Sequence, residues 1–231
     1  ARRARAQALP ALARAAAEGG AGRLRVAFVS TVGFDLLPRW VRGFRAQHPQ
    51  VQLELIEATG DVQLQALERG DIDAGFMLHS PGFAPPGLEQ LRIAREPLVL
   101  ALPEQHPLAG AQPLLLRKLL DEPLVIFPRR ILPSLHDAIF GLYHAASRAP
   151  LVAQEAIQMQ TIVNLVAAGL GLAWVPESVR QFQRPGVVYR SLEGTGRKAA
   201  PACETSLVWS ARPAGATLQR FTEFARQQLR K

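Results

Sequence analysis

The sequence predicts an α/β fold, and three observations support that class. Apolar segments of strand length, such as 24–29 and 72–78, alternate with segments whose apolar residues have helical spacing. Over about 55 residues the order is strand, helix, strand, helix, strand, which implies parallel pairing through right-handed crossovers and a sheet covered on both faces. At 231 residues, one large unit and two lobes of roughly 100 residues each are both possible.

The first third of the chain contains six expected elements. In order they are a strand (24–29), a turn (30–33), an amphipathic helix to residue 47, a strand (51–57), a helix ending at residue 70 and a strand (72–78). His48 and Pro49 end the first helix. The second strand is expected to turn Leu53 and Leu55 inward, and the next helix to present Leu64 on its apolar face with its neighbours at 62 and 67.

The rest of the chain repeats this pattern. Strands are expected at 98–102, 124–127, 151–154 and 172–175, helices at 114–120, 134–146 and 160–168, two further strands at 187–192 and 204–210, and a closing amphipathic helix at 216–229. Residues 2–18 are rich in Ala, Arg and Leu and also favour helix, which the glycines at 19, 20 and 22 end.

The composition is that of an ordinary globular protein, with 48% hydrophobic and 20% charged residues. The longest apolar run, 162–176, is broken by Asn164, Gly169 and Gly171, so we expect no membrane partner. A single cysteine, Cys203, excludes an internal disulfide, and the Cys and His spacing of a zinc site is absent. With no signal peptide recognised, the cytoplasm is the expected location.

A net charge of +8 suggests nucleic-acid binding, but the charge is unevenly distributed. Residues 1–25 hold six arginines and one glutamate and so carry +5, while the following 206 residues carry +3. The body of the protein is therefore near neutral. The basic segment is a solvated helix or a DNA contact, and we favour the helix.

Open α/β sheets bind ligands beyond the carboxyl ends of their strands, where loops lead into helix starts. This rule selects segments 30–33, 59–61, 127–135 and 158–161, which offer polar side chains beside free backbone N–H groups. Such groups favour carboxylates or phosphates, so an anionic small molecule is the expected ligand. The candidate contacts are Ser30, Thr31, Val32, Thr59, Gly60, Phe76, Met77, Phe127, Pro128, Arg129, Arg130, Gln158, Met159 and Gln160.

Each candidate also has a purely structural interpretation. Ser30 and Thr31 are suited to capping a helix as well as to binding. Arg129 and Arg130 would clamp a carboxylate through paired hydrogen bonds or stay solvated. Phe76 and its neighbour would form a pocket floor or simply pack in the core.

Signals for catalysis fail individually. The sequence lacks a Gly-x-Ser-x-Gly elbow and a P-loop, and we interpret 194–196 as a surface turn rather than a dinucleotide loop. Ser134, His136 and Asp137 face different directions on one expected helix, so they do not form a triad. We therefore expect neither an enzyme nor a cofactor or metal.

Several segments closely resemble the effector-binding domain of LysR-type transcriptional regulators. They are LRVAFVSTVGFDLLPRWVRGFRAQHPQVQLELIEA, LERGDIDAGF, LVLALPEQHPLA, LVAAGLGLAWVPES and GVVYRSL, which occur in the family's order over about residues 20 to 212. The resemblance implies a type 2 periplasmic-binding-protein-like fold, an α/β fold of two Rossmann-like lobes joined by two crossover strands. It divides the chain into a linker-helix tail (1–22), lobe I (23–91 plus 186–231) and lobe II (92–185). The winged helix-turn-helix of the family is expected to lie outside this chain.

The resemblance also implies a mode of action. A small carboxylate effector, aromatic or dicarboxylic, would bind between the lobes and control promoter DNA binding through that other domain, in a homodimer or homotetramer. The pattern is most similar to regulators of aromatic catabolism, in which Thr31 matches an effector contact. Gly60 departs from the expected threonine ahead of Gln63, and Met77 and Leu78 are apolar where that branch can carry a basic residue. The alternatives are a transport solute-binding protein of the same fold and an enzyme on a related scaffold.

Overall fold

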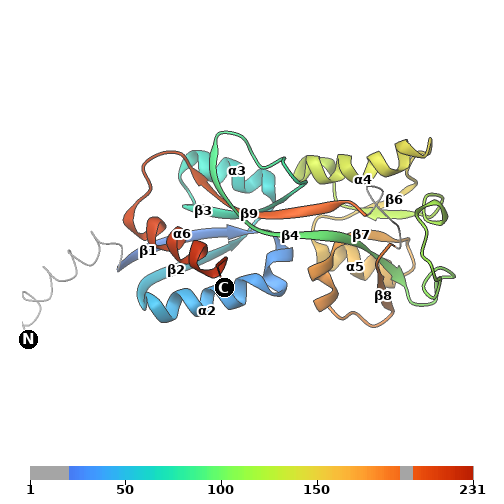
Figure 1. Cartoon of the computed structure of the whole chain (residues 1–231), viewed down its shortest axis with the longest axis horizontal. Helices are drawn as coiled ribbons and strands as arrows, with labels where there is room; N and C mark the ends of the chain where they lie inside the picture. The colour runs from blue at the N-terminus through green and yellow to red at the C-terminus, as the bar shows by residue number, and fades with distance from the viewer. Residues whose placement is uncertain (1–20, 193–199, 231) are drawn as a thin grey trace, which may run out of the picture.

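The computed structural model describes residues 21–192 and 200–230, which form two lobes along one long axis (Figure 1). The strands are β1 (Ala21–Phe28), β2 (Gln50–Glu57), β3 (Ala74–His79), β4 (Leu88–Pro103), β5 (Leu124–Ile126), β6 (Val152–Glu155), β7 (Ala173–Pro176), β8 (Val187–Arg190) and β9 (Ala202–Ser210). The α-helices are α2 (Leu36–Gln47), α3 (Gly60–Arg69), α4 (Pro133–Ala145), α5 (Met159–Ala167) and α6 (Ala216–Gln228). Short 3-10 helices are η1 (Ser30–Phe34), η2 (Leu116–Lys118), η3 (Arg129–Ile131) and η4 (Glu177–Gln181).

Lobe I combines the two ends of the described chain. β1 lies between β2 and β3 and runs parallel to both, as the alternating pattern predicts. On one face of this sheet α2 and α6 form an aromatic core, in which Trp40 meets Phe76 and Phe224 edge to face at centroid distances of 5.6 and 5.9 Å. Rings of this size and geometry contribute much of a core's stability.

Two long strands connect the lobes. β9 pairs antiparallel with β3 and with the first part of β4, up to Pro97. β4 then continues into lobe II, where residues 98–103 pair with β7 and β8. In its first part β4 has both exposed and buried side chains, whereas residues 98–102 are all buried, since both faces of the strand are covered there. Figure 1 shows β4 and β9 side by side along the length of the molecule.

Lobe II has its own apolar core, formed by β4, β5, β7, α4 and α5. β5 and β6 pair in parallel, as expected for strands joined through a helix. β8 pairs with β4 and packs against this core, so residues 187–190 lie with lobe II. This placement differs from the predicted boundary, which assigned them to lobe I, because the antiparallel return strand stays beside its β4 partner.

Three local predictions are wrong. The helix expected at 114–120 is only the 3-10 turn η2, because three leucines, Leu114, Leu119 and Leu120, must all reach the core between two prolines. Leu55 is 39% exposed because β2 is an edge strand. Val62 and Leu64 are 48% and 40% exposed, and α3 instead buries the side of the helix that carries Gln63.

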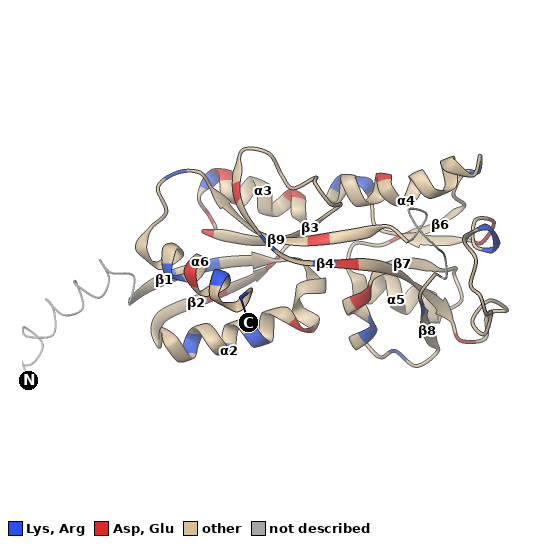
Figure 2. Cartoon of the chain, in the orientation of Figure 1, with Lys and Arg blue, Asp and Glu red and all other residues tan. Residues whose placement is uncertain are grey.

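Some predictions concern residues outside the described part. The helix predicted at 2–18 and the turn at 194–196 are among them, whereas the last two residues of the predicted linker tail (1–22), Ala21 and Gly22, belong to β1. Within the described residues, no helix combines the length and apolar character needed to cross a bilayer. Charged residues of both signs are spread over both lobes (Figure 2).

Candidate functional site

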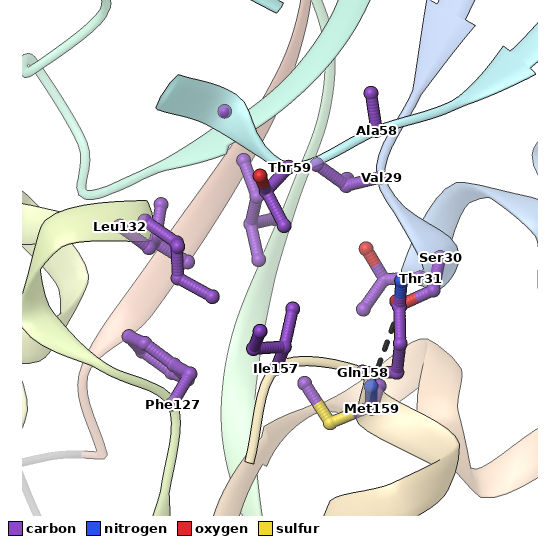
Figure 3. Close-up of a pocket in the computed structure, with 13 residues that line it drawn as sticks. Val29, Ser30, Thr31, Ala58, Thr59, Phe127, Leu132, Ile157, Gln158 and Met159 are labelled. Carbon is purple, nitrogen blue, oxygen red and sulfur yellow. Dashed lines mark hydrogen bonds between the residues drawn. The ribbon is translucent and has the colours of Figure 1, made fainter. Parts of the chain in front are cut away.

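Four loops and Leu78 of β3 meet in one cavity between the lobes. The ends of β1 and β2 bring Ser30 and Thr59 from lobe I, while the segments after β5 and β6 bring Phe127 and Gln158 from lobe II. These are the four loops that the strand-end rule selects. The lining residues are Val29, Ser30, Thr31, Ala58, Thr59, Gly60, Leu78, Phe127, Ile131, Leu132, Ile157, Gln158 and Met159 (Figure 3).

Thr31 is the most informative polar residue of the cavity. Its side chain is 8% exposed, and its hydroxyl oxygen has no hydrogen-bond partner in the structure. Burial of a hydroxyl group without a partner is unfavourable, so native proteins rarely leave one unsatisfied. The arrangement is therefore typical of a hydroxyl group whose hydrogen-bond partner is supplied by a ligand.

Next to Thr31, a hydrogen bond crosses between the lobes. The backbone N–H of Met159, the first residue of α5, lies 3.5 Å from the hydroxyl oxygen of Ser30 (Figure 3). The contact is long, and α5 has neither a side-chain cap nor an acidic residue in its first turn. The N–H groups that follow Met159 in the first turn, and the helix dipole, thus remain available to an anion in the cavity.

The second turn is arranged differently. The hydroxyl group of Thr59 donates to the carboxylate of Asp61 at 2.5 Å, so this hydroxyl is already used and a negative charge already lies at the start of α3. A side chain at Gly60 would place its Cβ 3.0 Å from the carbonyl oxygen of Ile131 and 3.2 Å from the Cε of Met77. The close approach of lobe II thus explains a glycine where the family resemblance leads one to expect threonine.

Gln63 holds this turn in position. It is fully buried, and its Nε2 donates to the carbonyl oxygens of Ala58 (2.8 Å) and Phe76 (3.2 Å). A Cβ at Gly75 would lie 2.3 Å from Oε1 of Gln63, so the glycine makes room for the amide. Sequence analysis identified Gln63 only through the resemblance, because a buried glutamine has no periodic signal.

The opposite wall of the cavity is apolar. Phe127 and Leu132 lie across the cavity from Ser30 and Thr31 (Figure 3), and Leu78, Ile131 and Ile157 are further apolar residues of the lining. Among the described lining residues, none is Lys, Arg, Asp or Glu. Sequence analysis named Phe127 but not the aliphatic residues of the lining, because apolar residues after a strand look the same whether they line a cavity or a core.

Several predicted contacts lie outside the cavity lining. Phe76 is fully buried in the lobe I core, and Val32, Met77, Pro128 and Gln160 are likewise absent from the described lining.

The predicted arginine clamp also lies away from the cavity. Arg129 and Arg130 are exposed on η3, and neither lines the pocket. Nε and Nη2 of Arg129 donate to the two carboxylate oxygens of Asp137, both at 2.7 Å, and this pairing lowers the pKa of Asp137. The guanidinium group of Arg129 is therefore already bound to a carboxylate, that of Asp137, rather than open to a ligand.

Further contacts join the lobes beside the cavity. The N–H of Ser80 donates to the hydroxyl group of Ser134 at 3.1 Å, and the hydroxyl group of Ser80 donates to the carbonyl oxygen of Ser134 at 2.8 Å. Phe34 of η1 stacks on Phe182 with ring centroids 5.7 Å apart. These contacts fix the relative position of the two walls in this structure.

Glu96 lies on the crossing strand β4. Its carboxylate accepts from the N–H and hydroxyl groups of Ser178 at 2.6 and 3.1 Å. Burial raises the pKa of Glu96, although the bonds from Ser178 oppose the shift.

The residues considered for catalysis stay separate. Ser134 is bonded to Ser80, Asp137 is paired with Arg129, and burial lowers the pKa of His136, which stacks on Phe140 at 4.1 Å. Over the part of the chain that the structure describes, no three His, Cys, Asp or Glu side chains gather into a possible metal site.

Comparison with known families decides which group of proteins this chain represents. The family model described as the LysR substrate binding domain matches residues 17–230. The chain belongs to the LysR family. The predicted type 2 periplasmic-binding-protein-like fold is thereby confirmed.

Individual LysR regulators support the assignment. The HTH-type transcriptional regulator IlvR of Caulobacter vibrioides is 42% identical over 213 residues, which are 92% of this chain and 70% of that protein. The crystal structure of CbnR, a LysR family transcriptional regulator, superposes with a TM-score of 0.77 at 30% identity and covers 96% of this chain and 74% of CbnR.

The effector-binding domain of BenM with its effector benzoate is also similar, with a TM-score of 0.72 and 26% identity over 90% of this chain and 91% of that domain. The chain spans only 53% to 64% of the length of seven further curated relatives, all transcriptional regulators or activators by name. Proteins of this kind are regulators rather than enzymes.

Proposed function

We propose that this chain is the effector-sensing part of a bacterial transcriptional regulator and that its effector is a small organic acid bound in the cavity between the lobes. The observation that carries the proposal is the buried, unpartnered hydroxyl group of Thr31 beside the uncapped start of α5. A carboxylate placed there would accept hydrogen bonds from both.

Relatives support the same mode of action. A LysR regulator, CbnR, has been seen with its target DNA, and the BenM domain has been seen with benzoate. For this chain we propose that an acid binds one relative arrangement of the lobes more tightly and so shifts a conformational equilibrium. A coupling of about 1–3 kcal/mol to a DNA-binding domain elsewhere in the protein would suffice for regulation.

The finer expectation of an aromatic or dicarboxylic acid concerns the shape of the ligand. Phe127 and the aliphatic side chains of the opposite wall support an apolar or aromatic body. The alternative, a transport solute-binding protein of the same fold, is not favoured, because the relatives named above regulate transcription.

Assembly and location follow from the proposed role. We propose a homodimer or homotetramer that acts on promoter DNA in the cytoplasm. Exposed apolar side chains on both lobes, among them Val62 (48%) and Leu151 (59%), are available for burial between copies. Light scattering after size exclusion should give twice or four times the mass of the chain, and a monomer at all concentrations would contradict this part.

The proposal is tested by thermal-shift screening of the chain with small carboxylates, followed by titration calorimetry. We expect at least one acid to raise the unfolding temperature in a concentration-dependent way, because a ligand that binds only the folded state stabilises it. An Arg129→Ala, Arg130→Ala double variant should respond as the wild type does, since neither arginine lines the cavity. Failure of every acid to stabilise the chain would overturn the proposed effector class.

A further inference from the structure

The charge pattern of the cavity wall restricts the ligand more narrowly than the proposed function does. Ser30, Thr31 and Gln158 lie opposite Phe127 and Leu132 (Figure 3), the hydroxyl group of Thr59 is already bonded to Asp61, and the described lining contains neither a basic nor an acidic side chain. Neither arginine of the neighbouring turn η3 lines the cavity, and Arg129 is held by Asp137. A ligand therefore meets one end that suits an anion and one that suits hydrocarbon.

We infer that the cavity selects a monocarboxylic acid with a compact apolar body, and that it discriminates against dicarboxylates and amino acids. This inference rests on the proposed function. It adds that the effector carries one charge and that the charge is negative.

The anionic end belongs at Thr31 and the start of α5. The hydroxyl group of Thr31 is buried and unpartnered, and α5 presents N–H groups without a cap or an acidic first turn. The start of α3 is less suitable, because the carboxylate of Asp61 already lies there and accepts the hydrogen bond of the Thr59 hydroxyl group. Two independent features thus mark one place for a single carboxylate.

The other end of the ligand would face Leu78, Phe127 and Leu132, which are buried or partly buried. A second carboxylate there would lose its water without gaining a cation or a hydrogen-bond donor. An ammonium group next to the carboxylate, as in an amino acid, would face the same problem, because the described lining holds no acidic side chain. Both kinds of ligand leave a charge unpaired in an apolar site.

Matched pairs of ligands test the inference on the whole chain. Hexanoate and hexanedioate share a carbon chain and differ by the second carboxylate, and 4-methylpentanoate and L-leucine differ by the ammonium group. Calorimetry should give a Kd at least about tenfold lower for the monocarboxylate of each pair, since an unpaired buried charge readily costs the 1.4 kcal/mol that corresponds to tenfold.

A gain-of-function variant makes the test sharper. Ile157 lines the cavity but is 47% exposed, so a long side chain there disturbs no core. Ile157→Arg should improve hexanedioate binding at least about tenfold over the uncharged control Ile157→Gln, because the guanidinium supplies the absent partner.

The outcomes separate the two proposals. If hexanedioate or L-leucine binds the wild type as tightly as its monocarboxylate partner, the inference is overturned while the proposed small-acid effector stands. If Ile157→Arg binds hexanedioate no better than Ile157→Gln, the lack of a cation in the lining does not limit dicarboxylate binding and the inference is also overturned. If no acid of any kind binds, the proposed function and the inference fall together.

Discussion

Replacement of Thr31 by valine should have opposite effects on the free and the ligand-bound protein. Valine has nearly the shape of threonine but lacks the hydroxyl group, which in this structure is buried and unpartnered. Desolvation of such a group costs about 1–3 kcal/mol. Removing it should therefore stabilise the free chain, and a gain of about 1 kcal/mol raises the unfolding temperature of a domain this size by roughly 2–4 °C.

Binding should change in the other direction. A hydrogen bond to a charged group contributes about 1.5–3 kcal/mol, and each 1.4 kcal/mol is tenfold in affinity. Thr31→Val should thus raise the Kd for a bound monocarboxylate roughly 10- to 150-fold. Calorimetry with the acid that stabilises the wild type most, combined with thermal unfolding of the free chain, measures both effects.

Two variants are the controls. Thr31→Ser keeps the hydroxyl group and should retain most of the affinity. Thr59→Val removes a hydroxyl from the same cavity, but one that already donates to Asp61, so affinity should change little. The reasoning is refuted if Thr31→Val binds the acid as the wild type does, or if Thr59→Val weakens binding equally.

Three further predictions concern the scaffold. Burial raises the pKa of Glu96 in the folded chain, so the stability that this group contributes at low pH is lost when it ionises. The unfolding temperature of Glu96→Gln should therefore rise relative to that of the wild type as the pH increases from 4 to 7. An equal difference at both pH values would contradict this. Gly171→Ala should be far more destabilising than Gly169→Ala. Both glycines have positive φ, for which a side chain costs about 1–2 kcal/mol, but only at Gly171 would the new Cβ lie 2.3 Å from a backbone oxygen, that of Pro123. Similar unfolding temperatures for the two variants would contradict this. Arg129→Ala should leave the denaturant midpoint nearly unchanged, since its ion pair with Asp137 is exposed, and it should also leave acid binding unchanged; a clear loss of stability would contradict this.

Much of the fold could be predicted from the sequence. Apolar periodicity correctly gave the alternating elements of lobe I and their parallel pairing, since burial on a sheet or helix leaves a regular spacing. It failed where tertiary contacts decide. The leucines at 114–120 have the composition of a helix but form a 3-10 turn, and the position of β8 depends on its pairing with β4.

The candidate site was predictable in position but not in chemistry. The strand-end rule selected all four loops, because it depends only on topology. The arginines at 129 and 130 follow the right strand, yet η3 turns them away from the cavity and Asp137 pairs with one of them. The apolar wall and the position of Gln63 depend on contacts between segments far apart in the chain, which no local pattern records.

The central claim is that an acid binds between Thr31 and the apolar wall, and methyl NMR tests it directly. The sequence contains two methionines, Met159 in the cavity lining and Met77 close to Gly60, so ¹³C-methyl labelling gives two assignable signals. On titration with the stabilising monocarboxylate, the Met159 signal should shift and saturate at the calorimetric Kd, and Thr31→Val should require more ligand for the same shift. An acid that stabilises the chain while both methionine signals stay unchanged would place the effector elsewhere and contradict the account.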